Sequence, residues 1–232
     1  MNSQILSKRL AQVAAFVPKY ARLADIGSDH AYLPIYLVAN KSINYAVAGE
    51  IAQGPLKAAS KQIKRYGYTN EIIPRLADGL MAIQPEDRID TVVIAGMGGI
   101  LTTTILTKGK EEGRLTKEQR LILQPNNHEQ SVRHWLATQH YKIYEEQIVE
   151  EHGKFYEIIV AYYKTDCHYT KKEIYFGPVL IQQKNLAFKK KWQKELQTKQ
   201  KVLSNLQNAR TAQKSKIEEV QQQIAWIKEV LK

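Results

Sequence analysis

Short apolar runs alternate with helix-length segments through the first 164 residues of the chain. The runs lie at 21–27, 44–51, 71–79, 90–99 and 119–127. Segments with helical spacing separate or follow them, at 31–39, 53–66, 100–106 and 128–138. Apolar runs of this kind, spaced by helices, are typical of βα units that build a parallel sheet.

Two longer stretches of β type follow, at 141–150 and 154–164, with His152-Gly153 between them. A glycine-containing pair at that place predicts a tight hairpin turn, so these two strands should be antiparallel. Five parallel-type strands and one antiparallel pair predict an α/β fold with a seven-stranded mixed sheet of the doubly wound kind.

The first 20 residues have the pattern of an amphipathic helix rather than of a secretion signal. Its apolar side comprises Ile5, Leu6, Leu10, Val13, Ala14 and Val17. No apolar stretch approaches the ~18 residues that a membrane span requires. A lone cysteine, Cys167, cannot form an internal disulfide and suits a reducing compartment. We therefore expect a cytoplasmic protein without a membrane partner.

The pattern changes after Cys167. A linker holds Gly177-Pro178, and no glycine or proline occurs from Val179 onward. Apolar residues then recur at alternating three- and four-residue steps, namely Leu196, Leu203, Leu206, Ile217, Val220, Ile224, Ile227 and Leu231. This heptad-type seam predicts a coiled-coil element. We accordingly expect two domains, residues 1–167 and residues 168–232.

Polar residues interrupt the seam at Lys199, Arg210 and Gln213, and residues 207–215 can form a turn. An antiparallel helical hairpin is therefore favoured over one long helix. A parallel coiled-coil dimer stays open as the alternative, so the chain is expected to be a monomer or a weak homodimer.

Positive charge is concentrated in the C-terminal part. The formal net charge is +11, and residues 169–232 hold 14 Lys or Arg against 5 Asp or Glu. Charge that is segregated in this way suggests an appendage that binds a polyanion. The densest group comprises Lys184, Lys189, Lys190, Lys191 and Lys194. We expect these lysines to contact RNA phosphates, and Trp192 among them to pack in the helical seam.

Acidic residues stand where the first three strands are expected to end. The first run ends in Asp25-Ile26-Gly27-Ser28-Asp29-His30, the second in Gly49-Glu50 and the third in Ala77-Asp78-Gly79. Ligands of an open parallel sheet bind at this edge. Glu50 can accept hydrogen bonds from ribose hydroxyls, and Asp78 from the amino group of an adenine. One such acid is more often a cap or turn former, but three together predict a nucleoside site.

The first of these motifs has a single glycine. Gly27 permits a tight turn, and the amides after it can form a polar cradle. The G-x-G-x-x-G pattern that brings backbone close to a pyrophosphate is missing. A phosphate-free cofactor is therefore favoured over the rival reading, a nicotinamide-dependent oxidoreductase.

Two further strand ends complete the site. The fourth run ends in a glycine-rich floor, 95–99, and the fifth in Gln124-Pro125-Asn126-Asn127, which places polar amides on a turn stiffened by proline. None of these strings is a metal-binding pattern, so no metal is expected.

Taken together, DIGSDHAYLP, AGEI, LADGL, VIAGMGG and LQPN resemble the motifs of class I, Rossmann-like methyltransferases that use S-adenosylmethionine. More narrowly, with the basic helical tail, the chain resembles bacterial tRNA (adenine-N1)-methyltransferases, which modify position 22 in the D-arm. The resemblance spans essentially the whole chain. It implies a seven-stranded methyltransferase domain, a C-terminal coiled-coil domain, S-adenosylmethionine as cofactor and tRNA as partner.

The resemblance also implies which residues hold the cofactor. Gly27 and its neighbours would hold the methionine portion, Glu50 the ribose, Asp78 and Gly79 the adenine, and 95–98 the side of the methyl donor. The full set is Asp25, Gly27, Ser28, His30, Glu50, Ile51, Asp78, Gly79, Ala95, Gly96, Met97 and Gly98.

Methylation of adenine N1 needs no prior deprotonation, because the neutral base carries a lone pair there. The task is in-line positioning and stabilisation of the positive charge that grows on the base. Our hypothesis is that Asp29 or Asn126 accepts a hydrogen bond from the adenine amino group. Gln124, Pro125 and His30 would shape the pocket of an everted nucleotide. Alternatives are another RNA base as substrate, or a non-enzymatic RNA-binding protein with a degenerate Rossmann-like domain.

Overall fold

The computed structural model describes residues 6–208 and 214–232. It divides into two compact units, Met1–Tyr169 and Thr170–Lys232. We call them the sheet unit and the helical unit. Residues 4 and 5 of the predicted N-terminal helix, and Arg210 and Gln213 of the predicted turn, lie outside the described residues.

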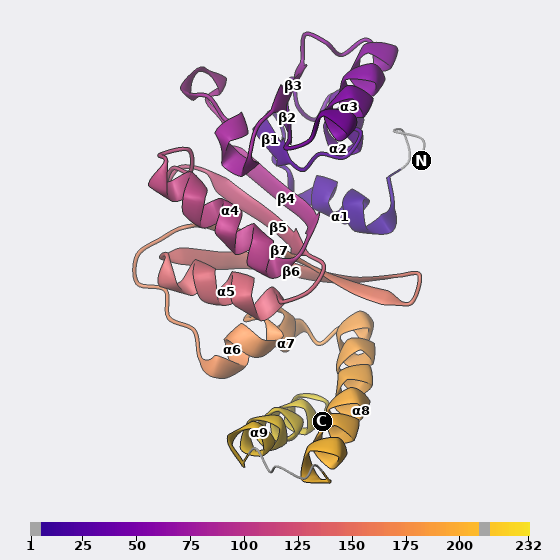
Figure 1. The fold of residues 1–232 in the computed structure, drawn as a ribbon, viewed down its shortest axis with the longest axis vertical. Helices are drawn as coiled ribbons and strands as arrows, with labels where there is room; N and C mark the ends of the chain where they lie inside the picture. The colour runs from indigo at the N-terminus through magenta and orange to yellow at the C-terminus, as the bar shows by residue number, and fades with distance from the viewer. Residues whose placement is uncertain (1–5, 209–213) are drawn as a thin grey trace. The chain divides into compact units, whose positions relative to one another are not determined.

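The sheet unit is built on seven strands in the order β3-β2-β1-β4-β5-β7-β6 (Figure 1). Their bounds are β1 Arg22–Ile26, β2 Tyr45–Glu50, β3 Ile72–Leu76, β4 Thr91–Met97, β5 Arg120–Pro125, β6 Tyr141–Glu151 and β7 Lys154–Tyr163. The first five are parallel to one another, and β7 is antiparallel to both β5 and β6. The predicted seven-stranded mixed sheet is confirmed.

The predicted hairpin turn between β6 and β7 is also confirmed. His152 and Gly153 both have positive φ, 50° and 72°. Two consecutive residues with positive φ give the turn a twist that matches the twist of the paired strands.

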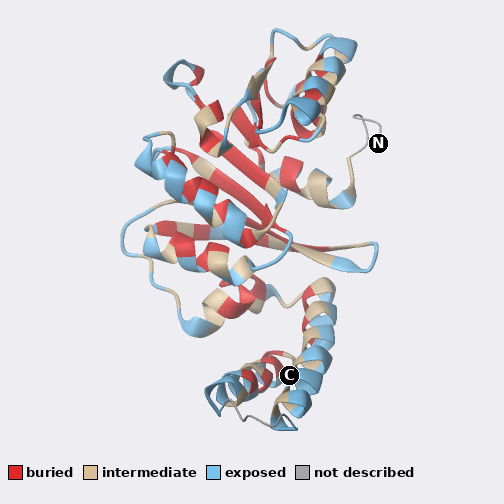
Figure 2. Cartoon of the chain, in the orientation of Figure 1, coloured by how far each residue is buried: buried red, intermediate tan, exposed pale blue. Residues whose placement is uncertain are grey.

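Helices connect the parallel strands and cover the sheet. In the sheet unit they are α1 Lys8–Phe16, α2 Tyr32–Ala39, α3 Gln53–Tyr66, α4 Gly99–Glu111 and α5 Glu129–Thr138, with short 3-10 helices η1 Gly79–Ala82 and η2 Pro85–Asp87. Alternate strand residues such as Leu23, Val93 and Ile122 join α1, α2 and α3 in one buried cluster. Figure 2 shows that α4 and α5 have buried and exposed sides, as the 3.6-residue period requires.

The starts of α2, α4 and α5 differ from the sequence expectation by one residue, and α4 is longer than expected. Ala31 and His128 have left-handed backbone, φ 56° and 53°, so α2 and α5 begin one residue later than predicted. Helix α4 continues to Glu111 instead of ending at 106. It contains Gly109, where a Cβ would overlap the side chain of Leu80. That glycine permits close packing and does not end the helix.

The helical unit comprises α6 Lys171–Phe176, α7 Leu180–Gln183, α8 Leu186–Gln207 and α9 Lys214–Val230. Helices α8 and α9 pack against each other, which supports the predicted hairpin over a single long helix. The sequence analysis missed α6, which begins at a capping box formed by Thr170 and Glu173.

An aromatic cluster forms the core of the helical unit. Trp192 is 3% exposed and contacts Phe176 and Tyr175 at ring-centroid distances of 4.5 and 5.1 Å. Trp192 is therefore packed, as expected. The predicted seam is only partly buried: Val220, Ile224 and Ile227 are buried, whereas the other seam residues are half-buried, namely Leu196, Leu203, Leu206, Ile217 and Leu231.

Within the part of the chain that the structure describes, no helix has the length and apolarity needed to cross a bilayer. Among the same residues, no group of three or more His, Cys, Asp or Glu side chains is arranged to hold a metal ion.

Candidate active site at the strand ends

A small cavity lies at the carboxyl ends of β1 to β4, where the sequence placed the site. Its volume is about 130 Å³. It is lined by Ile26, Gly27, Gly49, Glu50, Ile51, Ala77, Asp78, Gly79, Met97, Leu101 and Ile105. Six of the twelve predicted cofactor residues are in this set, and four different strand ends contribute to it.

Glycine is required at two places in this lining. Gly27 has φ 72°, and a Cβ there would overlap the terminal methyl group of Met97. Gly49 would bring a Cβ to 2.8 Å from Cβ of Ala82. The absence of a side chain at both positions therefore lets Met97 and Ala82 pack directly against the backbone of these strand ends.

Glu50 closes one side of the cavity and is 7% exposed. Its Oε1 accepts a hydrogen bond from the backbone N–H of Asp29 at 2.6 Å. Burial raises the pKa of Glu50, and the Asp29 hydrogen bond acts in the opposite direction. One carboxylate oxygen thus fixes the loop after β1, and the other is available to a ligand.

Asp78 also lines the cavity and is exposed. Its Oδ2 accepts from the ammonium group of Lys108 at 2.6 Å, which the sequence analysis did not predict. The pair joins the end of β3 to the last turn of α4. Oδ1 of Asp78 keeps its acceptor capacity for an amino group.

The remaining walls are apolar although they face solvent. Ile51 and Leu101 are 69% and 52% exposed. Large exposed apolar side chains beside a cavity with two carboxylates are typical of a site for a flat, partly polar ligand. Leu101 and Ile105 were missed by sequence reasoning, although their spacing of four residues after the glycine-rich floor puts them on one side of α4.

The loop after β1 has an unusual backbone. Asp29, His30 and Ala31 all have positive φ, 38°, 60° and 56°. Left-handed backbone costs energy for residues with a Cβ and concentrates at functional sites. The His30 ring stacks on Tyr32 at 5.3 Å, and the Asp29 side chain is exposed.

Asp25 lies beneath this loop and does not line the cavity. It is 4% exposed, and its Oδ2 accepts from the Ser28 hydroxyl at 2.6 Å. The pKa of Asp25 is raised to about 7, chiefly by burial, while the Ser28 hydrogen bond acts to lower it and the nearby carboxylate of Glu50 acts to raise it. Asp25 and Ser28 therefore support the loop from within.

A second polar group lies at the ends of β4 and β5. The ladder between them is irregular at Ala95/Met97, and Gly96 donates its N–H to Oε1 of Gln124 at 3.0 Å. The Gln124 amide donates to Oδ1 of Asn126 at 3.2 Å, and Asn126 donates to the carbonyl of Gly96 at 2.7 Å. Such an irregularity beside a site re-aims backbone and side chains.

Arg9 joins this group from α1, which sequence reasoning missed. Its Nη1 donates to Oε1 of Gln124, and its guanidinium lies over the ring of Tyr156 with Cζ 5.6 Å from the centroid. No local sequence signal marks Arg9, because 115 residues separate it from Gln124.

The predicted residues thus fall into three sets. Those in the cavity lining are Gly27, Glu50, Ile51, Asp78, Gly79 and Met97. Those around the loop after β1 are Asp25, Ser28, Asp29 and His30, and those at the β4 and β5 ends are Ala95, Gly96, Gly98, Gln124, Pro125 and Asn126. The sets meet at Met97 and at Glu50, which touch more than one strand end.

The predicted lysines lie at the start of α8 and just before it. Lys184 follows α7 with φ 43°, and Lys189, Lys190, Lys191 and Lys194 are in the first turns of α8. Lys189, Lys190 and Lys194 are exposed, whereas Lys191 is half-buried beside Trp192. Consecutive helical residues point about 100° apart, so these lysines spread positive charge around the helix.

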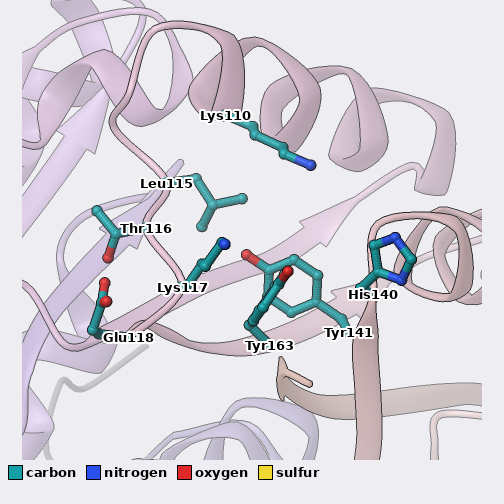
Figure 3. Close-up of a pocket in the computed structure, with 8 residues that line it drawn as sticks. All are labelled: Lys110, Leu115, Thr116, Lys117, Glu118, His140, Tyr141 and Tyr163. Carbon is teal, nitrogen blue, oxygen red and sulfur yellow. The ribbon is translucent and has the colours of Figure 1, made fainter. Parts of the chain in front are cut away.

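A larger cavity of about 540 Å³ lies near the start of β5 (Figure 3). Its lining includes Lys110, Lys117, His140, Tyr141 and Tyr163. Burial raises the pKa of Tyr141 to about 12. The cavity contains none of the predicted site residues, so volume alone would have pointed away from the strand-end carboxylates.

Comparison with known proteins gives a consistent result. The family model described as tRNA (adenine(22)-N(1))-methyltransferase matches residues 23–229. The tRNA (adenine(22)-N(1))-methyltransferase of Bacillus subtilis (strain 168) is 42% identical over 238 residues, covering 100% of this chain and 99% of that protein.

Two solved structures contain a ligand. A Streptococcus pneumoniae protein in complex with S-adenosyl-L-methionine is 41% identical, with a TM-score of 0.89 over 98% of this chain and 100% of that one. TrmK of M. capricolum in complex with S-adenosyl-homocysteine is 30% identical, with a TM-score of 0.84 over 98% of this chain and 99% of that one.

Proposed function

The chain belongs to the tRNA (adenine(22)-N(1))-methyltransferase family, and from that premise we propose how its residues carry out the reaction. It transfers the methyl group of S-adenosylmethionine to N1 of adenine 22 in a tRNA. The observation that carries the proposal is the cavity at the strand ends, which is lined by the carboxylates of Glu50 and Asp78 together with apolar side chains.

The residues of the cavity fit the cofactor. Glu50 offers one carboxylate oxygen to the ribose hydroxyls, since Asp29 occupies the other. Asp78 offers Oδ1 to the amino group of the adenine, and Ile51 and Leu101 supply apolar contact to the ring. Gly27 and Gly49 let Met97 and Ala82 pack close to the backbone that borders the cavity. When bound, S-adenosylmethionine supplies an activated methyl group on sulfur.

On the substrate side, the chain's task is to hold the base in line and to stabilise positive charge. Either Asn126 or Asp29 accepts the hydrogen bond from the amino group of the target adenine. Asn126 is oriented by Gln124 and by the carbonyl of Gly96, and its Oδ1 retains a free lone pair. Asp29 holds its exposed carboxylate on the rigid loop after β1. Such preorganised acceptors stabilise growing charge without further rearrangement.

We assign residues 1–167 to cofactor binding and methyl transfer and residues 168–232 to tRNA binding. The lysines at the start of α8 would neutralise phosphates of the tRNA. The aromatic core beneath them, formed by Phe188, Trp192 and their neighbours, gives α8 a fixed position within the helical unit.

The test is to incubate the full chain with an unmodified tRNA transcript and isotope-labelled S-adenosylmethionine, then to digest the RNA and identify the labelled nucleoside by mass spectrometry. We expect 1-methyladenosine, and its loss when adenine 22 is replaced by another base. Label on a different nucleoside would assign another RNA base as substrate. Tight tRNA binding with no label would favour a non-enzymatic RNA-binding protein.

A further inference from the structure

We propose that Arg9 binds a backbone phosphate of the RNA beside the target nucleotide. This inference rests on the proposed function, because the ligand is a phosphodiester of the same substrate. It assigns a site on α1, outside the residues that the motifs mark, to one chemical group of the tRNA.

Helix α1 holds Arg9 in a defined place. Ser7 caps the helix by accepting from the N–H of Leu10 at 3.2 Å. The backbone N–H of Lys8 donates to Oε1 of Glu151 at 2.5 Å, which ties the first turn to β6. Val13 and Ala14 are buried in the core. The backbone of Arg9 is therefore anchored on both sides.

The guanidinium is oriented by neutral partners. Nη1 donates to Oε1 of Gln124, which is 0% exposed, and the guanidinium lies over the ring of Tyr156. A Cβ built on Gly96 would lie 3.4 Å from Nη1 of Arg9. Arg9 therefore lies against the same irregular segment of β4 whose carbonyl orients Asn126.

The charge of Arg9 is not neutralised by direct contact. Among the described residues, no carboxylate lies within ion-pair distance of Arg9; the buried carboxyl of Asp25 interacts with it only at longer range, and Gln124 accepts its side-chain hydrogen bond. Arg75 and Arg133 in the same unit differ, since they pair with Asp87 and with Glu146 and Glu157. A guanidinium has five N–H donors, so most of the donors of Arg9 are available to a ligand.

A phosphate is the ligand that this arrangement fits. Arginine binds phosphate oxygens in a bidentate manner, and RNA brings phosphates wherever it brings a base. Contact between Arg9 and the base itself is disfavoured, because a cation near N1 opposes the positive charge that methylation places on the ring. Gln124 and Tyr156 would keep the guanidinium away from the target base and beside the expected path of the nucleotide backbone.

The test compares Arg9→Gln, Arg9→Lys and the unsubstituted chain on tRNA carrying either natural phosphates or neutral methylphosphonates on both sides of adenine 22. With natural tRNA, we expect Arg9→Gln to weaken tRNA binding and raise KM roughly 10-fold or more, with cofactor affinity unchanged. Arg9→Lys should recover part of the loss, because it keeps the charge but not the fork. Methylphosphonate should weaken binding by the unsubstituted chain and have little further effect on Arg9→Gln.

Arg65→Gln is the matched control. Arg65 is exposed in the last turn of α3 and lies over Tyr66, with its Cζ 6.0 Å from the ring centroid. It should behave like the unsubstituted chain. If methylphosphonate weakens tRNA binding by Arg9→Gln as much as it weakens binding by the unsubstituted chain, the two losses of affinity are additive. That result would overturn the phosphate assignment and leave Arg9 with only a structural role, in connecting α1 to Gln124. If the unsubstituted chain methylates no adenine, the proposed function fails, and the Arg9 assignment fails with it.

Discussion

The two units handle charge in opposite ways. The sheet unit buries charged side chains, namely Asp25, Glu50, Asp87, Arg133, Glu146 and Glu157. In the described part of the helical unit, the buried side chains are apolar or aromatic, such as Phe176, Phe188 and Trp192, and the lysines lie at or near the surface.

With the roles proposed above, this difference predicts how each unit recognises its ligand. A buried charge is costly unless its partners are fixed, so the sheet unit holds each carboxylate in a network with defined geometry. Surface charge costs little but is screened by salt within about 10 Å at 0.1 M ionic strength. We therefore expect ligand binding by the sheet unit to depend on the positions of individual atoms. Ligand binding by the helical unit should depend on its total charge.

The largest effect should follow from Glu50→Gln. The change keeps the size of the side chain but removes the charge that strengthens hydrogen bonds to ribose hydroxyls. We expect the Kd for S-adenosylmethionine to rise roughly 10- to 100-fold, measured by isothermal titration calorimetry, with tRNA affinity nearly unchanged. Glu86→Gln, at an exposed residue of η2, is the control and should bind normally. An unchanged Kd for Glu50→Gln would remove this residue from the cofactor site.

A smaller effect, spread over several residues, should follow from replacing Lys189, Lys190 and Lys194 together by Gln. We expect tRNA affinity to fall roughly 10-fold at 0.1 M salt and its salt dependence to become shallower. Binding can be measured by fluorescence anisotropy over a salt series. Cofactor affinity should stay the same.

The control for this triple variant carries the same change of charge on the sheet unit. Lys57, Lys61 and Lys64 are exposed on α3, and their replacement by Gln should have less effect on tRNA binding. Equal losses in the two triple variants would mean that net charge, and not the start of α8, governs tRNA binding.

The smallest effect should follow from Asp25→Asn and depends on pH. The pKa of Asp25 is raised by burial from its ordinary value of 3.8 to about 7. Between these values the folded chain binds more protons than the unfolded chain, so this carboxyl lowers stability as pH rises from about 4 to about 7. Asparagine does not titrate and can still accept from Ser28.

We therefore expect the Tm difference, Asp25→Asn minus the unsubstituted chain, to be a few degrees higher at pH 8 than at pH 5. Differential scanning fluorimetry at the two pH values measures this. Asp166→Asn, at an exposed loop position, controls for removal of one negative charge. A Tm difference that is equal at both pH values would contradict a raised pKa of the buried Asp25.

Much of the sheet unit could be predicted because its signals are local. The helix Gln53–Tyr66 and the turn at His152-Gly153 were both predicted at their observed positions. The strand ends could be predicted for the same reason, since an apolar run that stops at a polar residue fixes where a parallel strand ends. Glu50 and Asp78 then follow from the rule that these ends share one edge.

Features that depend on packing between distant segments could not be predicted. Arg9 contacts Gln124, and Lys108 contacts Asp78, only after the sheet has brought α1 and α4 to those strand ends. Likewise, the heptad pattern of leucines did not show that Tyr175, Phe176 and Trp192 form the main core of the helical unit. Gly109 in α4 was ambiguous, since a glycine that ends a helix and one that lets Leu80 approach look the same in the sequence.

The run of left-handed residues Asp29, His30 and Ala31 has a consequence for ligand entry. The conformational cost of this bend is met when the polypeptide folds, and the Asp29 amide on Glu50 helps to keep it. This loop therefore already has its bound conformation before a ligand arrives. Because little of the loop has to become ordered on binding, the conformational entropy lost on association should be small.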